Sequence, residues 1–96
     1  MLNAKERATL KSLAVNLKDL VFIGKEGLTD TVIDQINDNL YAHELIKIKV
    51  QKSVIDEMGE LADNIAKTCE AEIVSVIGSK ILVYKFTSKP KFKHLL

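Results

Sequence analysis

The residues able to do chemistry are sparse in this 96-residue sequence, and they do not group into a catalytic set. The single cysteine, Cys69, falls on the apolar side of a helical pattern, where a thiol is usually a small core residue. His43 and His94 are far apart and lack metal-ligand spacing, and one cysteine makes a zinc site very unfavourable. The sequence has no Walker A phosphate-binding loop. We therefore expect a protein that is not an enzyme, with no metal, no cofactor and no small-molecule substrate.

The segment Gly24-Lys25-Glu26-Gly27 is the feature that best fits ligand binding. It follows a short apolar run and precedes a helical pattern, so free N–H groups at the helix start face the loop and attract anions. The two glycines leave room for a sugar–phosphate backbone, and Lys25 adds a positive charge. KH domains clamp nucleotide backbones with a G-x-x-G loop. An ordinary turn is the alternative interpretation, because glycines often serve only that purpose.

The charges are unevenly distributed along the chain. Residues 1–29 carry five basic and three acidic side chains, residues 30–72 carry four and ten, and residues 73–96 carry five and none. A nucleic-acid face would therefore have to be local, built from the two ends of the chain. An alternative is that the acidic middle docks a basic protein through a helical stripe formed by Asp30, Asp34 and Asp38.

Lysines accompany two of the predicted strands. Lys47 and Lys49 alternate with apolar residues, and Lys80 and Lys85 flank and end the last strand. Lysine contacts phosphates as a point charge. For Lys47 and Lys49, protection of a sheet edge is an equally good interpretation.

The elements that must position these residues follow from the hydrophobic periodicity. It predicts a buried strand at 20–23, further strands at 46–50, 73–77 and 81–86, and helices over about 4–16, 30–40 and 53–69. Capping patterns mark the helix starts at Asn3, Thr29 and Ser53. The first helix should bury Leu10, Leu13, Ala14 and Leu17. This order predicts a single α/β (α+β) domain over 1–96, with helices packed on a four-stranded mixed sheet and a basic tail at 88–96 whose order the sequence leaves open.

The pattern as a whole resembles one known family. The segments that carry the resemblance are Leu10-Lys11-Ser12-Leu13-Ala14, Val21 to Thr29, His43 to Val50, Val76-Ile77-Gly78 and Leu82-Val83-Tyr84. They are similar to the CRM domain (chloroplast RNA splicing and ribosome maturation), and specifically to the stand-alone bacterial YhbY-like proteins. The resemblance implies an α-β-α-β-α-β-β fold related to the C-terminal domain of bacterial translation initiation factor three. It also implies RNA binding and association with precursors of the large ribosomal subunit.

The same resemblance assigns positions to the RNA-binding surface. The family's G-x-x-G loop falls on Gly24, Lys25, Glu26 and Gly27. The surrounding basic surface would include Lys11, Lys18, Lys47 and Lys49. Glu26 departs from an ideal anion site because its carboxylate repels phosphate, so the lysines must supply most of the attraction.

The first residues and the lengths of the apolar runs indicate where in the cell the protein is expected. The first residues are polar and charged, and no apolar run approaches the roughly 20 residues of a membrane helix. We expect a cytoplasmic protein with no membrane contact, whose partner is RNA.

Overall fold

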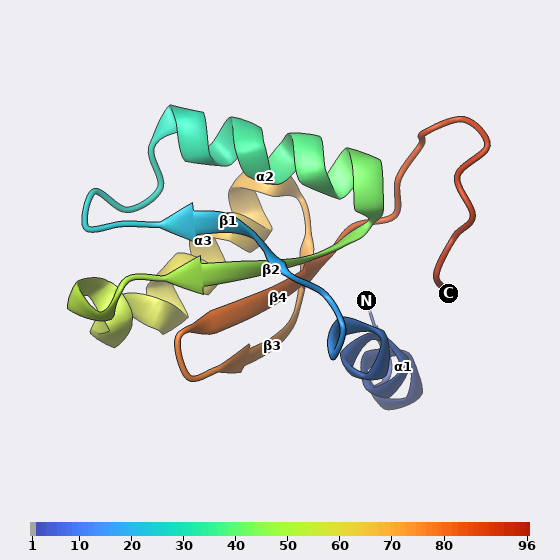
Figure 1. Ribbon diagram of the computed structural model, residues 1–96, viewed down its shortest axis with the longest axis horizontal. Helices are drawn as coiled ribbons and strands as arrows, with labels where there is room; N and C mark the ends of the chain where they lie inside the picture. Colours follow the sequence, from blue (N-terminus) through green and yellow to red (C-terminus); the bar gives the residue numbers. More distant parts are fainter. Residues whose placement is uncertain (1) are drawn as a thin grey trace.

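The computed structural model describes residues 2–96 and confirms the predicted order of helices and strands (Figure 1). The helices are α1 (Ala4–Ala14), α2 (Asp30–His43) and α3 (Met58–Cys69), and a 3-10 helix, η1 (Lys52–Glu57), precedes α3. The strands are β1 (Asp19–Ile23), β2 (Leu45–Val50), β3 (Glu72–Ile77) and β4 (Lys80–Tyr84).

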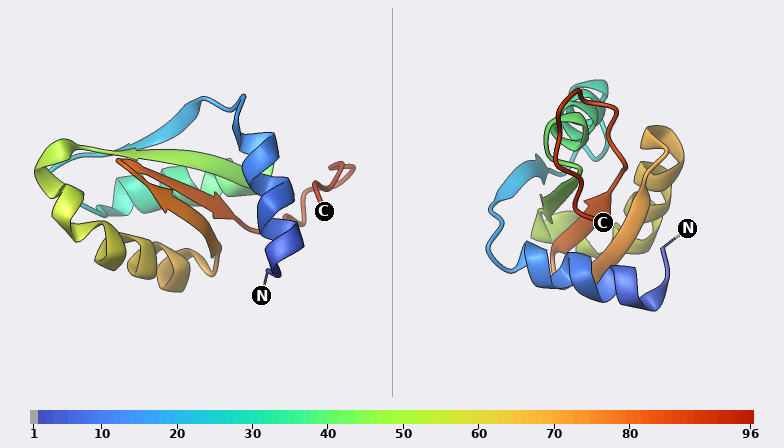
Figure 2. Two further views of the ribbon diagram at one scale, coloured as in Figure 1. Left: turned by 90° about the horizontal axis from the view of Figure 1, so that it is seen from below. Right: turned by 90° about the vertical axis from the view of Figure 1, so that its right-hand side faces the viewer.

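The four strands form one mixed sheet in the order β1-β2-β4-β3. Strands β1 and β2 are parallel and are linked through α2, while β4 pairs antiparallel with both β2 and β3. Helices α2 and α3 pack on one face of this sheet, and α1 crosses one end of the other face (Figure 2). One half of that second face is therefore left without a covering helix.

Strand β2 shows how the sequence divides the sheet into two faces. Ile46, Ile48 and Val50 are buried in the core beneath α2 and α3, together with residues of β1 and β4. Leu45 points the other way and packs in a smaller cluster under α1. Successive side chains of a strand alternate between faces, so Lys47 and Lys49 lie on the same face as α1.

Two of the three predicted helix starts are confirmed. Asn3 and Glu6 form a reciprocal capping box, and the Thr29 side chain accepts a hydrogen bond from the N–H of Val32. The prediction of a capped start at Ser53 was wrong, because residues 52–57 form a 3-10 helix and α3 begins only at Met58. Tight 3-10 turns are frequent at helix N-termini, and this one buries Val54 against the core.

The prediction of which apolar residues are buried is confirmed for only half of those named in α1 and β1. Leu10 and Ala14 are buried, but Leu13 is exposed on the outer side of α1, and Leu17 is exposed because α1 ends at Ala14, before it is reached. In β1, Phe22 is 54% exposed, although the apolar run had predicted a buried strand. The physical reason is that α1 covers only the far end of this face.

A buried carboxylate ties the C-terminal tail to the domain. Glu44 ends α2 with φ of 70° and is fully buried. Its carboxylate accepts hydrogen bonds from the N–H groups of Thr87 (2.9 Å) and Leu95 (3.0 Å), and its Oε2 lies 2.6 Å from Nδ1 of His94. Burial acts to raise the pKa of Glu44, but these hydrogen bonds outweigh it and hold the pKa below its ordinary value. The tail lies at the end of the molecule opposite to the Gly24–Gly27 loop (Figure 1).

Candidate nucleic-acid interface

The Gly24–Gly27 loop is a tight turn fixed to the end of strand β2. The N–H of Gly27 donates to the carbonyl of Gly24 (3.0 Å), and Gly27 has φ of 73°, a left-handed conformation that favours glycine. Gln51 holds the other end, because its side-chain oxygen accepts from the N–H of Lys25 (3.2 Å) and its own N–H donates to Ile23 (2.8 Å). The loop is therefore held in position beside the start of α2, with Lys25 exposed.

One side of this loop is acidic. Lys25 and Glu26 line a hollow of about 270 Å³ together with Glu57 at the end of η1 and Glu60 of α3, so three carboxylates lie there with one lysine. Carboxylates at this hollow repel a phosphate that approaches from the α3 side. An anion would therefore reach the loop from the opposite direction, over the uncovered half of the sheet.

That uncovered half carries a row of four residues that crosses all four strands. In the strand register Phe22 pairs with Lys49, Lys49 pairs with Lys80, and Lys80 pairs with Ile77. All four side chains are exposed, with Phe22 at 54% and Ile77 at 69%. The row thus places a pair of lysines between an aromatic and an aliphatic side chain, at the end of the sheet where the Gly24–Gly27 loop begins.

Lysines from neighbouring elements extend the row. Lys47 lies on β2 beside Leu82 of β4, and Lys11 of α1 lines the same hollow as Lys47 and Lys80. We call the group formed by Lys11, Lys47, Lys49, Lys80, Phe22 and Ile77 the lysine face. The fold therefore brings together lysines that are as much as 69 positions apart in the sequence, from Lys11 to Lys80.

Two lysines of this face have partners in the structure. Nζ of Lys80 forms a salt bridge with Asp19 at 3.1 Å, and Nζ of Lys47 donates to the carbonyl of Leu17 at 3.2 Å. Exposed ion pairs contribute at most about 1 kcal/mol. A phosphate can therefore replace Asp19 as the partner of Lys80, because breaking this salt bridge costs little free energy.

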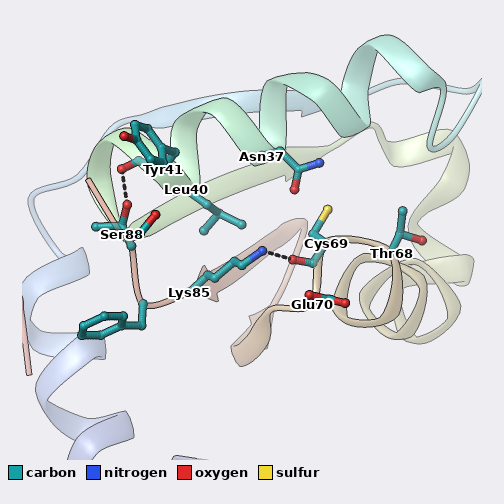
Figure 3. Close-up of a pocket in the computed structure, with 10 residues that line it drawn as sticks. Asn37, Leu40, Tyr41, Thr68, Cys69, Glu70, Lys85 and Ser88 are labelled. Carbon is teal, nitrogen blue, oxygen red and sulfur yellow. Dashed lines mark hydrogen bonds between the residues drawn. The ribbon is translucent and has the colours of Figure 1, made fainter. Parts of the chain in front are cut away.

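The structure places Lys85 on the other side of the sheet from the lysine face, and Lys18 at a different hollow from the one lined by Lys11, Lys47 and Lys80. Lys85 lies on the helix-covered side, where its Nζ donates to the carbonyl of Cys69 at 2.8 Å and so caps the C-terminus of α3 (Figure 3). It lines a hollow of about 340 Å³ with Asn37 and Tyr41. Lys18 lines a separate apolar hollow with His43 and Leu95.

The acidic stripe and the aromatic residues near the end of the chain lie outside the lysine face. Asp30, Asp34 and Asp38 are exposed on α2, which packs on the sheet face opposite to the lysine face. Tyr84 is buried under α1, and Phe86 stacks on His94 with ring centroids 4.2 Å apart. Tyr84 is therefore used in core packing, whereas Phe86 stacks on His94 at the surface and stays 64% exposed.

Reactive groups outside the lysine face are few in residues 2–96. Burial raises the pKa of the Cys69 thiol, which disfavours the reactive thiolate. Within this range no cluster of three or more histidine, cysteine, aspartate or glutamate side chains has the arrangement needed for a metal ion. None of its helices has the length and apolar character that crossing a membrane requires.

Three residues of this site were missed by the sequence prediction. Phe22 and Ile77 flank the lysine pair, and Gln51 anchors the loop. Period-two alternation in β1 could have placed Phe22 opposite to the buried Val21 and Ile23. The roles of Ile77 and Gln51 depend on pairings between distant segments, which no local signal reveals.

The fold and the site define a small α/β domain with a cationic sheet face and an adjoining glycine loop. The chain belongs to the CRS1 / YhbY (CRM) domain family, whose sequence profile matches residues 2–85. It is 33% identical over 91 residues to the probable RNA-binding protein YqeI of Bacillus subtilis, covering 95% of each chain. It is 36% identical over 86 residues to the probable RNA-binding protein MJ0652 of Methanocaldococcus jannaschii, covering 88% of this chain but spanning only 63% of that protein. The solution structure of the hypothetical protein SAV1595 from Staphylococcus aureus is similar, with a TM-score of 0.80, 38% identity and 95% coverage of both chains.

Proposed function

We propose that this protein binds RNA through the lysine face and the Gly24–Gly27 loop, without catalysis. The observation that carries the proposal is the direct pairing of Lys49 with Lys80 between two exposed apolar side chains. Like charges placed opposite each other destabilise a sheet, and Asp19 neutralises only one of these two lysines, so the pair keeps a positive charge that a ligand can bind. A polyanion would neutralise both charges, and the exposed Phe22 ring suits stacking on a base.

Charge segregation supports one orientation of the RNA. The acidic stripe of α2 lies on the other side of the sheet, and the carboxylates of Glu26, Glu57 and Glu60 line the α3 side of the loop. A backbone that crosses the lysine face would reach the loop from the side away from these carboxylates. The N-terminus of α2 would then meet a phosphate.

We further propose that the RNA is ribosomal RNA in precursors of the large subunit. The names of the protein's relatives support RNA as the partner, and the assignment to ribosomal RNA rests on the resemblance to the CRM family alone. Crosslinking in cells followed by sequencing of the bound RNA tests it. Enrichment of large-subunit precursor RNA is expected, and a distribution that simply follows RNA abundance would contradict it.

A protein adaptor that docks through Asp30, Asp34 and Asp38 is the competing function, because this stripe is exposed. Pull-downs before and after nuclease treatment separate the two. Ribosomal proteins that are captured only while RNA is intact support RNA binding. Capture that survives nuclease and is lost on Asp34→Lys would support the adaptor.

A further inference from the structure

A hollow of about 270 Å³ lies between α1 and the sheet, next to the row of exposed residues. Its apolar walls come from Ala14 of α1 and Val15 directly after it, Ile77 of β3 and Leu82 of β4. Lys11, Lys47 and Lys80 stand around it, and Ser75 adds one hydroxyl. The hollow is therefore apolar inside and positively charged at its rim.

Two of the four apolar residues of this hollow, Val15 and Ile77, are unusually exposed for their type, whereas Ala14 and Leu82 form its buried floor. Val15 is 76% exposed and Ile77 is 69% exposed, although neither contributes to the core clusters. Contiguous exposed apolar surface bordered by polar residues marks an interaction site in a soluble protein. The surrounding lysines indicate an occupant that combines an apolar surface with negative charge.

An unpaired nucleotide has this combination, because its base has two apolar ring faces and its phosphates are anionic. We propose that this hollow takes the base of an unpaired nucleotide while Lys11, Lys47 and Lys80 bind the phosphates on either side of it. The inference rests on the proposed function and names the form of RNA that the lysine face binds.

Two properties of the RNA follow from the lining. A paired base is stacked within its helix and must be extruded at a cost of a few kcal/mol before it can enter, so single-stranded segments are preferred to duplex. Ser75 is the only lining side chain besides the lysines that can hydrogen-bond a base edge. The hollow should therefore accept different bases with little preference, as stacking surfaces do.

The test compares Ile77→Ser with Val76→Ser. Both residues are exposed on β3, but Val76 pairs with the buried Ile81 and so faces the helix side of the sheet. The probes are a short unstructured RNA, a blunt duplex of the same sequence, and a single strand with abasic sites at its central positions. Circular dichroism confirms that both variants fold, and fluorescence anisotropy gives their affinities.

The expected result has three parts. Ile77→Ser weakens binding of the unstructured RNA about tenfold relative to Val76→Ser. On the abasic strand the two variants bind equally, because the base that the hollow would take is missing. The duplex binds more weakly than the single strand to the parent protein, and Ile77→Ser does not weaken it further.

Equal affinity of the two serine variants for the unstructured RNA would overturn the inference, while salt-dependent binding by both would leave the proposed function intact. Loss of an acidic protein partner on Ile77→Ser, with RNA binding unchanged, would also overturn it. If the parent bound none of the probes in a salt-dependent way, the proposed function would fail, and this inference with it.

Discussion

Reversing the charge of Lys49 should move stability and RNA affinity in opposite directions. Lys49 is exposed and pairs directly with Lys80 in the antiparallel β2–β4 register. A cross-strand charge pair is worth about 0.2–1 kcal/mol in either direction. Lys49→Glu replaces a repulsive pair by an attractive one, and after a discount for solvent screening the free energy of unfolding should rise by about 0.5–1 kcal/mol.

The assay for this prediction has two arms. Thermal unfolding followed by circular dichroism should show a Tm higher by about 2–8 °C for a domain of this size. Anisotropy with a ribosomal RNA fragment should show an affinity about tenfold lower, and a slope of log affinity against log salt that is smaller by about one phosphate contact.

Lys67→Glu is the matched control for Lys49→Glu. It makes the same change in net charge, but Lys67 lies in the last turn of α3, on the other side of the sheet. Its RNA affinity should stay within about threefold of the parent, as expected for a charge remote from the phosphates. If Lys49→Glu lost stability, or bound RNA as well as Lys67→Glu, the proposed role of the lysine pair would be refuted.

Three further predictions concern the buried carboxylate, the loop and the salt bridge. Glu44→Gln should lower the unfolding free energy by about 2 kcal/mol, because Glu44 accepts hydrogen bonds from Thr87 and Leu95. Since the folded-state pKa of Glu44 is lowered, its contribution to stability is present above the ordinary value of 4.5 and is lost as the pH falls through the folded-state pKa. Denaturant melts at several pH values should show that Glu44→Gln lacks this part of the acid dependence. An unchanged acid dependence would contradict the role of Glu44 in holding the C-terminal tail. Gly27→Ala should lower the free energy of unfolding by about 1 kcal/mol. The left-handed backbone alone accounts for this loss, because a Cβ at Gly27 would meet nothing within 4 Å. Gly24→Ala should lower the unfolding free energy less, and the reverse order in thermal melts would contradict the loop geometry. Asp19→Asn should free Lys80 and raise RNA affinity about threefold, whereas weaker binding in the same anisotropy assay would indicate that Asp19 positions Lys80 for the RNA.

The fold was largely predictable because its local signals agree with one another. The Asn3–Glu6 pair and Thr29 marked two helix starts, and both caps are present in the structure. The alternation of Ile46, Ile48 and Val50 with lysines identified β2 and its two faces. The Ser53 pattern failed because capping-box spacing also occurs where a 3-10 turn precedes the helix.

The site was less predictable, because its geometry depends on contacts between distant segments. The pairing of Lys49 with Lys80 is set by the β2–β4 register, and the exposure of Phe22 depends on where α1 stops covering the sheet. The position of Lys85, by contrast, could have been predicted from local sequence. Lys85 lies an odd number of positions from Lys80, so strand alternation alone places the two lysines on opposite faces of the sheet.

The order of the C-terminal tail also depends on distant residues. From the sequence alone, the order of the basic tail at 88–96 was left open. In the structure, however, the carboxylate of Glu44 binds the N–H of Leu95 and lies beside His94. A single buried glutamate in the middle of the chain thus positions a tail about 50 residues away.

The central claim is that the lysine face holds the RNA backbone, and the salt dependence of binding tests it most directly. Affinity for a large-subunit ribosomal RNA fragment would be measured between about 50 and 200 mM salt for the parent and for a variant with Lys11, Lys49 and Lys80 changed to glutamine. We expect the parent to bind with a steep slope, and the variant to bind weakly with a slope shallower by about 2 to 3 units, since each lost phosphate contact removes about 0.7–0.9. Equal slopes for the two proteins, or a salt-independent affinity of the parent, would contradict the claim.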